Sequence, residues 1–239
     1  MKKNKFNIYY WLRKIYTTKF FQLLSINKNK MKKKIFTSIY KSNHWVQNSD
    51  GLPEKFVSVS GHGSNINTEQ YKNLNVNFNN MLEKFNIDSI IDMPCGDFLW
   101  IKNTILEKKI KYLGIDIVDE LILENNKIYK NNHIEFLAKD IVDFITEEKY
   151  DLVLIRDLFI HIKNSDIKKI INNVKKMQIK YIALNSYEIN QNEDVVVGKH
   201  RKVNILSEPF NLPKPIFSFS DYEKDKFIYL YKIEQIIPL

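Results

Sequence analysis

The stretch Ser89 to Trp100, SIIDMPCGDFLW, decides how the rest of the chain is interpreted. Ile90 and Ile91 make a short apolar run, which the turn-forming sequence Pro94-Cys95-Gly96-Asp97 ends abruptly. A short apolar run that is cut by a turn and followed by a helical pattern predicts a buried parallel strand leading into a helix. Gly96 permits close approach of the backbone to a ligand, and the N-terminus of the following helix offers free N–H groups.

A second short strand, Ile110 to Ile115, ends in Asp116, twenty residues after Gly96. An acidic side chain at that distance can accept hydrogen bonds from both hydroxyls of a ribose. An ordinary tight turn with a solvent-exposed Asp116 is the alternative interpretation. Because the turn and the acid occur together at this spacing, the sequence favours a nucleoside-binding site.

The composition restricts the class of protein. A chain of 239 residues is long enough for one α/β domain with a sizeable core and an appendage. The single cysteine, Cys95, excludes internal disulfides and cysteine-cluster metal sites, and the five scattered histidines show no metal-ligand spacing. No apolar run reaches the ~18 residues of a membrane span, and the N-terminus lacks an apolar signal-peptide core. A cytoplasmic protein without a bound metal is therefore expected.

The formal net charge of +9 is concentrated at the N-terminal end. Residues 1–49 hold eleven Lys and one Arg without any acid, which leaves 25 basic against 28 acidic residues in the remainder. We therefore divide the chain into a basic helical N-terminal extension, residues 1–55, and a second domain, residues 56–239. Within the extension, Lys30 to Lys34 is interpreted as a charged linker and Ile35 to Trp45 as a short helix with an aromatic anchor.

The first part of the extension has an amphipathic pattern at helical spacing. A basic amphipathic helix can lie on the anionic inner face of a membrane, dock on a partner, or pack on its own domain with a solvated cationic face. The last interpretation is slightly favoured, because the charged residues continue beyond the pattern. The charge lies away from the predicted nucleoside site, so no nucleic acid is expected as a partner. The apolar positions are Ile8, Trp11, Leu12, Ile15, Tyr16, Phe20, Leu23 and Leu24.

A Gly/Ser-rich loop, Ser58 to Ser64, precedes the first strand. Backbone groups of Gly61, Gly63 and Ser64 could fold over a bound cofactor. A plain flexible loop is an equal alternative. The helix between this loop and the first strand is predicted to start at Asn67, with a glutamine three residues later as in a capping box.

The alternation of strands and helices continues to the C-terminus. Helices are predicted directly after Asp97, near Asp119 and after a Ser165-Asp166 cap. Further strands are predicted at Ile134 to Ala138, Leu152 to Ile155 and Ile179 to Leu184, followed by a hairpin of Ile216 to Phe219 and Phe227 to Ile233. The sequence thus predicts an α/β fold with a seven-stranded, mostly parallel sheet and a C-terminal antiparallel hairpin. Polar residues follow the parallel strands at one sheet edge, where ligands bind: Asp97, Asp116, Asp140, Arg156, Asp157 and Asn185.

Five segments occur in a characteristic order: Ser60-Gly61-His62-Gly63-Ser64, Asp92 to Trp100, Asp116-Ile117-Val118, Arg156 to His161 and Gly198 to Leu206. Together they resemble the class I S-adenosylmethionine-dependent methyltransferases. The resemblance is closest to a bacterial group with SGxGS, DxPCGDFxW and RDxxxH motifs, although His62 stands where that group usually has proline. It implies a Rossmann-like methyltransferase domain in residues 56–239, with S-adenosylmethionine as the cofactor.

The resemblance also implies which residues contact the cofactor. Asp92 and the turn of Pro94, Cys95 and Gly96 would approach its methionine part, and Asp116 would hold its ribose. The remaining implied contacts are Asp140 with the adenine amine, Ile117 and Ile141 with the faces of the ring, and Arg156 with the methionine carboxylate or an anionic acceptor.

Three residues are candidates for the base. Methyl transfer is a displacement at a sulfonium carbon, so the protein mainly positions the acceptor and removes its proton. His161 and Asp157 are four residues apart and share a face if a helical turn starts there, and His62 is a further candidate. A structural histidine that braces the loop after the fourth strand is an equal alternative for His161.

The acceptor pocket is expected in the long segment from Tyr187 to Pro215, with Tyr187, His200 and Arg201 as binding residues. The basic run Lys199-His200-Arg201-Lys202 could bind a phosphate or carboxylate, and a solvated surface turn is the alternative. The resemblance suggests a small-molecule or sugar acceptor, and together with the basic run it leads to the first hypothesis, O-methylation of a small, phosphorylated or glycan-linked acceptor in surface polysaccharide biosynthesis. A nucleic-acid methyltransferase and a non-catalytic cofactor-binding module are the competing hypotheses.

Overall fold

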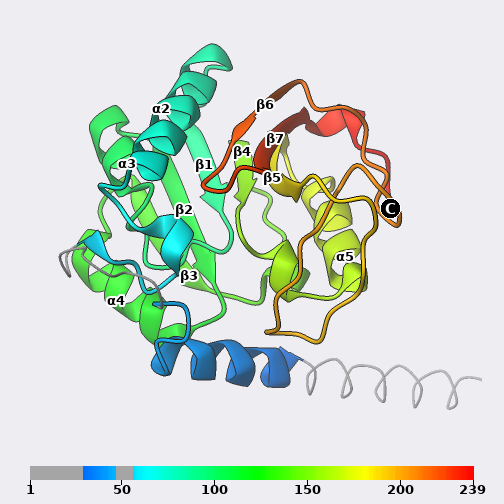
Figure 1. Cartoon of the computed structure of the whole chain (residues 1–239). Coiled ribbons are helices and arrows are strands. Elements are labelled where there is room, and N and C mark those ends of the chain that lie inside the picture. The colour runs from blue at the N-terminus through cyan, green and yellow to red at the C-terminus, as the bar shows by residue number, and fades with distance from the viewer. Residues whose placement is uncertain (1–28, 47–55) are drawn as a thin grey trace, which may run out of the picture.

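The computed structural model describes residues 29–46 and 56–239. In this part of the chain seven strands form one sheet in the order β3-β2-β1-β4-β5-β7-β6 (Figure 1). Strands β1 to β5 pair in parallel, and β7 is antiparallel to both β5 and β6. The predicted α/β fold with a closing hairpin is confirmed. The strands are β1 Ser89–Asp92, β2 Lys111–Asp116, β3 Ile134–Ala138, β4 Tyr150–Ile155, β5 Ile179–Tyr187, β6 Phe217–Ser220 and β7 Lys226–Lys232.

The strand order reverses between β1 and β4, the two strands at the centre of the parallel part. In an open parallel sheet, ligands bind outside the carboxyl ends of the strands at such a point. Successive residues of a strand point to opposite faces, so Ile90 and Ile91 belong to two different apolar clusters. Because both faces are buried, these strands are continuous apolar runs in the sequence.

Helices cover both faces of the sheet (Figure 1). α2 (Glu69–Lys84) and α3 (Lys102–Lys108) pack in the cluster that contains Ile90. α5 (Asn164–Val174) packs in the cluster that contains Ile91, and α4 (Asp119–Tyr129) contributes to both clusters. The sheet domain also contains the short 3-10 turns η2 His62–Ser64, η3 Ile141–Asp143, η4 Phe159–His161 and η5 Ile233–Gln235.

The helix after β1 starts later than the sequence predicts. α3 begins at Lys102, so the prediction of a helix directly after Asp97 is wrong, and its N-terminus does not follow Gly96. Trp100 lies in the intervening turns, where its ring packs on Phe78 with the centroids 5.3 Å apart. The residues expected to form the first turn of the helix thus form turns that are held by apolar contacts.

Three other element boundaries differ from the prediction. Thr68, one residue later than predicted, caps α2 because its hydroxyl accepts the Tyr71 N–H at 3.1 Å. Ser165-Asp166 lies inside the first turn of α5, so the predicted cap is wrong. β5 extends to Tyr187, past the predicted end at Leu184, because its last three residues pair with β7.

The described part of the N-terminal extension packs on the sheet domain (Figure 1). Residues 29–41 are helical, so the predicted linker from Lys30 to Lys34 is wrong. The helix is held by the buried Phe36 and by the ammonium of Lys32, which lies 2.9 Å from the Asp140 carboxylate. Trp45 is the predicted aromatic anchor, with its ring centroid 6.3 Å from that of Phe36. The amphipathic pattern of residues 8–24 lies outside the described residues, and the domain boundary after residue 55 stays a prediction.

Candidate functional site

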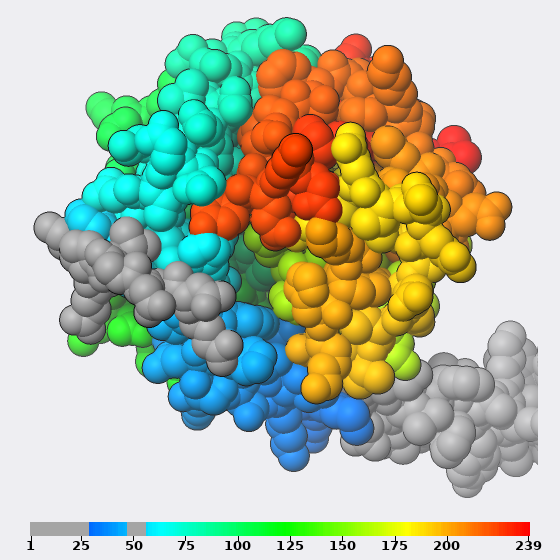
Figure 2. Space-filling model, viewed as in Figure 1, coloured from blue at the N-terminus to red at the C-terminus, as the bar shows by residue number. Residues whose placement is uncertain are grey.

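A cavity of about 630 Å³ lies at the carboxyl ends of β1, β2 and β4. Figure 2 shows a hollow bordered by residues near 30–46 (blue), the start of the sheet domain (cyan) and the C-terminal segments (orange). A volume of this size suits a cofactor or a drug-sized ligand. Every predicted site residue lines it except Asp92 and Arg201: Gly61, His62, Gly63, Ser64, Pro94, Cys95, Gly96, Asp116, Ile117, Asp140, Ile141, Arg156, Asp157, His161, Tyr187 and His200.

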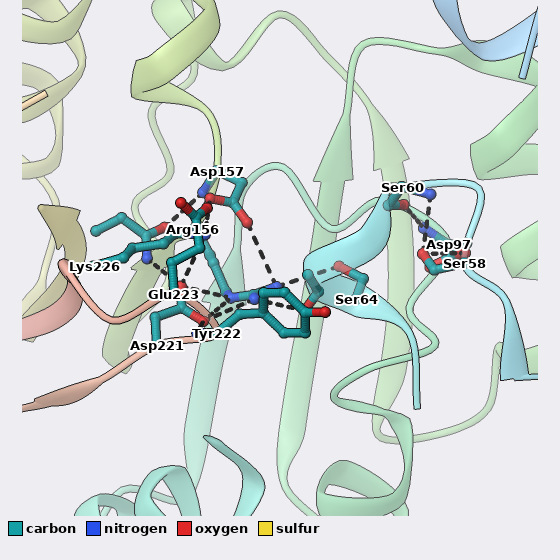
Figure 3. A network of polar contacts seen from close by, with 12 residues as sticks. Ser58, Ser60, Ser64, Asp97, Arg156, Asp157, Asp221, Tyr222, Glu223 and Lys226 are labelled. Carbon is teal, nitrogen blue, oxygen red and sulfur yellow. Dashed lines mark hydrogen bonds and ion pairs between the residues drawn. The ribbon is translucent and has the colours of Figure 1, made fainter. Parts of the chain in front are cut away.

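The loop from Ser58 to Ser64 is fixed to the turn after β1. One Asp97 carboxylate oxygen accepts the Ser58 hydroxyl and the Val59 N–H, both at 2.8 Å, and the Asp97 N–H donates to the Ser60 hydroxyl (Figure 3). Gly96 has a φ of +52°, and a Cβ there would lie 2.1 Å from the Ser60 hydroxyl oxygen. Gly96 is therefore needed for the approach of this loop, which forms a fixed wall of the cavity.

Asp116 ends β2 and borders the cavity with 8% of its surface exposed. Its two carboxylate oxygens accept backbone hydrogen bonds, among them those from the N–H groups of Val118 at 3.1 Å and of Gly96 at 3.4 Å. Burial raises the pKa of Asp116 to about 6, against the opposing effect of these N–H groups. A carboxylate has about four acceptor positions, so Asp116 can still accept hydrogen bonds from a ligand.

Asp140 follows β3 and lies on the same side of the cavity. One of its oxygens accepts the Val142 N–H at 3.0 Å, and the other lies 2.9 Å from the ammonium of Lys32. Lys32 also lines the cavity, although it comes from the extension that the sequence interpretation separated from the site. Ile117 and Ile141 supply apolar surface beside Asp140.

Asp92 does not line the cavity, so its predicted contact with the methionine part of a cofactor is not supported. Its side chain is buried, one oxygen accepts the Tyr112 hydroxyl at 2.8 Å, and the other has no hydrogen-bond partner among the described residues. Burial raises the pKa of Asp92 to about 7. Asp92 thus acts as an interior carboxyl group under the turn rather than as a cavity residue.

A buried network of paired charges lies at the other side of the cavity (Figure 3). The Arg156 guanidinium donates to Asp221 at 2.8 Å, to the Gly63 carbonyl at 2.7 Å and to the Ser64 hydroxyl at 3.2 Å. The Lys226 ammonium lies 2.6 Å from Asp157 and 3.2 Å from Asp221. Although burial opposes ionisation, these cations hold the pKa of Asp221 well below its usual value.

Two consequences follow for the predicted roles of this network. Arg156 lines the cavity as expected, but its charge is already paired with Asp221. Asp157 has a φ of +60° and is paired with Lys226, and the helical turn after it is the short η4, which begins at Phe159. The predicted helical face shared by Asp157 and His161 is therefore wrong.

His161, the last residue of η4, lies at the cavity wall with its Nδ1 atom 3.1 Å from the Lys199 carbonyl oxygen. A carbonyl only accepts, so Nδ1 carries the proton and Nε2 keeps its lone pair. The Trp45 ring packs on the imidazole with the centroids 5.3 Å apart. Burial lowers the pKa of His161 to about 4, so the ring is neutral at pH 7.

The C-terminal hairpin contributes residues that the sequence interpretation missed. The Tyr222 hydroxyl contacts Nε2 of His62, with the ring centroids 4.7 Å apart, and joins the β6–β7 turn to the loop of η2. The buried Tyr187 donates its hydroxyl to Glu223 at 3.0 Å. The turn from Asp221 to Glu223 lies outside every recognised motif, and only its polar sequence after β6 marks it.

Arg201 does not line the cavity, so the prediction that it binds the acceptor is not supported. Its guanidinium is surrounded by protein oxygens, three of them main-chain carbonyls. His200, its neighbour, is exposed and does line the cavity. In the described residues, no group of three potential ligands among His, Cys, Asp and Glu is placed to hold a metal ion. No described helix has both the length and the apolar character needed to cross a membrane.

No protein-family model matches the chain, and a search of the curated proteins gives no match. Solved structures do resemble it. The PH0226 protein from Pyrococcus horikoshii has 15% identity and a TM-score of 0.53, over 71% of this chain and 93% of that one. An S-adenosylmethionine-dependent methyltransferase from Clostridium acetobutylicum has 14% identity and a TM-score of 0.50, over 68% and 91%.

Magnesium protoporphyrin IX methyltransferase from Synechocystis, solved with bound S-adenosylhomocysteine, has 12% identity and a TM-score of 0.50 over 84% of this chain and 97% of that one. At such identities the likeness concerns the fold, and the bacterial motif group named above stays a prediction. The chain therefore has the Rossmann-like fold of S-adenosylmethionine-dependent methyltransferases.

Proposed function

We propose that the chain is an S-adenosylmethionine-dependent methyltransferase whose cofactor binds in the cavity at the ends of β1 and β2. The observation that carries this proposal is Asp116, a carboxylate at the cavity wall whose described hydrogen bonds come from backbone N–H groups. It stands at the strand end where an acid holds a ribose in sheets of this type. The shared fold supports the proposal but does not establish the activity.

The other residues of this side fit the same cofactor. Ile117 and Ile141 line the cavity and could contact the flat adenine ring, with Asp140 beside them. Asp140 keeps acceptor capacity for an amine, even though Lys32 and the Val142 N–H use part of it. The backbone of the turn at Pro94 to Gly96 borders the same space and could hold the methionine part.

When bound, the cofactor would supply an electrophilic methyl group, so the protein's task is to place an acceptor and to take its proton. His161 is the strongest base candidate, because its Nδ1 is held by the Lys199 carbonyl and its Nε2 lone pair is available. A pKa of about 4 leaves the ring unprotonated at pH 7, so Nε2 can take the proton that the acceptor oxygen gives up as it is methylated. His62, paired with Tyr222, is the second candidate.

The acceptor would occupy the side of the cavity formed by Tyr187, His200, Tyr222 and Glu223. We propose an oxygen atom of a small molecule as the methylated atom. A phosphorylated or glycan-linked acceptor in surface polysaccharide biosynthesis, and a cytoplasmic site of action near the inner membrane face, rest on the sequence pattern. The Arg156 and Lys226 cations are paired with carboxylates, so they offer little net charge to a polyanion such as nucleic acid.

The test is transfer of labelled methyl groups from S-adenosylmethionine to fractionated metabolites, with and without nuclease treatment of the extract. The proposal predicts a small acceptor that survives nuclease and is lost with His161→Asn, while binding of S-adenosylhomocysteine persists. An acceptor destroyed by nuclease would show a nucleic-acid methyltransferase. Cofactor binding without any acceptor would show a non-catalytic module, and full turnover by His161→Asn would move the base to His62 or Asp157.

A further inference from the structure

Arg201 binds the turn that carries His161. Its guanidinium donates to the Phe159 carbonyl at 2.5 Å and to the Ile162 carbonyl at 3.0 Å, on either side of His161. It also donates to the Asn164 side-chain oxygen at 2.6 Å and to the Glu193 carbonyl at 2.7 Å. Four neutral oxygens from two segments thus converge on one side chain.

The main chain also joins η4 to residues 198–201, the segment that carries Arg201. The Arg201 N–H donates to the Ile160 carbonyl at 3.0 Å, and the Gly198 N–H donates to the His161 carbonyl at 2.9 Å. Between these two bonds, the Lys199 carbonyl accepts the Nδ1 proton of His161. Gly198 has a φ of +85°, and a Cβ there would lie 2.5 Å from Ile35, so the segment is also pressed against the N-terminal helix. The position of the Lys199 carbonyl is therefore fixed from both sides.

We infer that Arg201 is a positioning residue for His161: by holding η4 against residues 198–201 it keeps the Lys199 carbonyl on Nδ1 and leaves Nε2 as the proton acceptor. The inference rests on the proposed function for the use of that lone pair, and on this structure for the contacts. A guanidinium has five N–H donors in a fixed planar fork, whereas an ammonium has three around one point. Lysine therefore cannot replace the four contacts.

The tautomer and the pKa of the His161 imidazole both depend on this arrangement. The charged or titratable groups that face it are Asp157, which favours the protonated ring, and His200 and Lys226, which oppose it. The Trp45 ring covers it from the N-terminal segment. If the two segments separate, water reaches the ring, and both the fixed tautomer and the lowered pKa are lost.

The experiment is NMR of the full chain with ¹⁵N-labelled histidine, with the His161 signals assigned by His161→Gln. The unmodified protein should show the Nδ1–H tautomer and a pKa near 4. Arg201→Lys should give mixed tautomers and a pKa shifted toward the usual 6.5, and Asn164→Ala, which removes one contact, should shift both in the same direction but less. The matched control is Lys202→Met, which removes the ammonium that pairs with Asp225. This variant should show the same His161 tautomer and pKa as the unmodified protein.

A wild-type tautomer and pKa in Arg201→Lys would overturn the inference, as would an equal change in Lys202→Met. If Arg201→Lys does not fold, Asn164→Ala decides, and an unchanged ring there is the contradicting result. Titration with S-adenosylhomocysteine separates this inference from the proposed function. Absence of binding to the unmodified protein would refute the proposed function, while the tautomer and pKa would still test the role of Arg201.

Discussion

The two sides of the cavity hold their charges in different ways. On the side of β2, the Asp116 carboxylate borders the cavity with backbone N–H groups as its described partners. On the side of β4 and β7, Arg156, Asp157, Asp221 and Lys226 neutralise one another in a closed network. Burial raises the pKa of Asp116 to about 6, whereas the paired cations lower the pKa of Asp221 despite its burial.

This difference separates the group that we propose binds the cofactor from the groups that hold the loops together. A buried charge with its partners in the protein stabilises a particular arrangement of loops, and its removal leaves the partners unpaired. A carboxylate that keeps acceptor capacity at a cavity wall gains partners only when a ligand arrives. Substitutions on the network side should therefore change stability, and substitution of Asp116 should change binding.

The largest effect is expected at Asp221. Asp221→Asn removes the anion shared by Arg156 and Lys226, so the free energy of unfolding should fall by roughly 3–5 kcal/mol, as for other broken buried pairs. Denaturant unfolding at pH 7 measures it. The control, Asp225→Asn, breaks the outer pair with Lys202 and should cost at most about 1 kcal/mol. Equal losses in the two variants would remove the distinction between a scaffold network and a surface pair.

A smaller effect is expected at the wall between the two sides. Gly96→Ala places a Cβ on the Ser60 hydroxyl and a side chain at positive φ, so it should cost about 2 kcal/mol or more. Thermal unfolding of Gly96→Ala, Ser60→Gly and the double variant checks this. In the double variant the clash is absent and only the backbone strain remains. The loss of thermal stability caused by Ser60→Gly should therefore be smaller in the Gly96→Ala variant than in the unmodified protein. Strict additivity would contradict the proposed contact.

Asp92 sharpens the comparison, because it is an incompletely paired carboxyl group that does not line this cavity. Its pKa of about 7 in the folded protein lies above the usual 3.8, so the folded state binds more protons and stability falls as the pH rises from about 4 to 7. Asp92→Asn imitates the neutral acid and should stabilise the protein by roughly 1–2 kcal/mol at pH 8, and by less at pH 5. Melting temperatures at both pH values test this, and a variant less stable at pH 8 would contradict it.

The sheet could be predicted because its signals are local. The apolar runs of the parallel strands stop at polar residues, and β3 has the predicted bounds Ile134–Ala138. The start of the helix after β1 was predicted wrongly, because Trp100 packs on Phe78 and α3 begins only at Lys102. That contact joins residues far apart in the sequence. The helical segment that includes Lys30 to Lys34 was missed for a similar reason, since it is held by the buried Phe36 and by the pairing of Lys32 with Asp140 of the sheet domain.

The candidate site shows the same limit. Strand-end residues such as Asp116 and Arg156 were found because the topology brings them to one edge. Asp221 and Lys226 were missed because their importance comes from pairing with Arg156 and Asp157, which no spacing reveals. Arg201 was noticed for its place in a motif, but its contacts lie with the turn of His161 rather than with the cavity.

The most direct test of the central claim is calorimetric titration of the protein with S-adenosylhomocysteine, at pH 7 and at pH 5, for the unmodified chain and Asp116→Asn. Since the pKa of Asp116 is about 6, its carboxylate is charged at pH 7 and largely protonated at pH 5. The unmodified chain should therefore bind S-adenosylhomocysteine more weakly at pH 5 than at pH 7. Asp116→Asn should lose about 1–3 kcal/mol of binding at pH 7, roughly tenfold or more, and show little of this pH dependence. An unmodified chain that does not bind, or a variant that binds equally well at pH 7, would contradict the account.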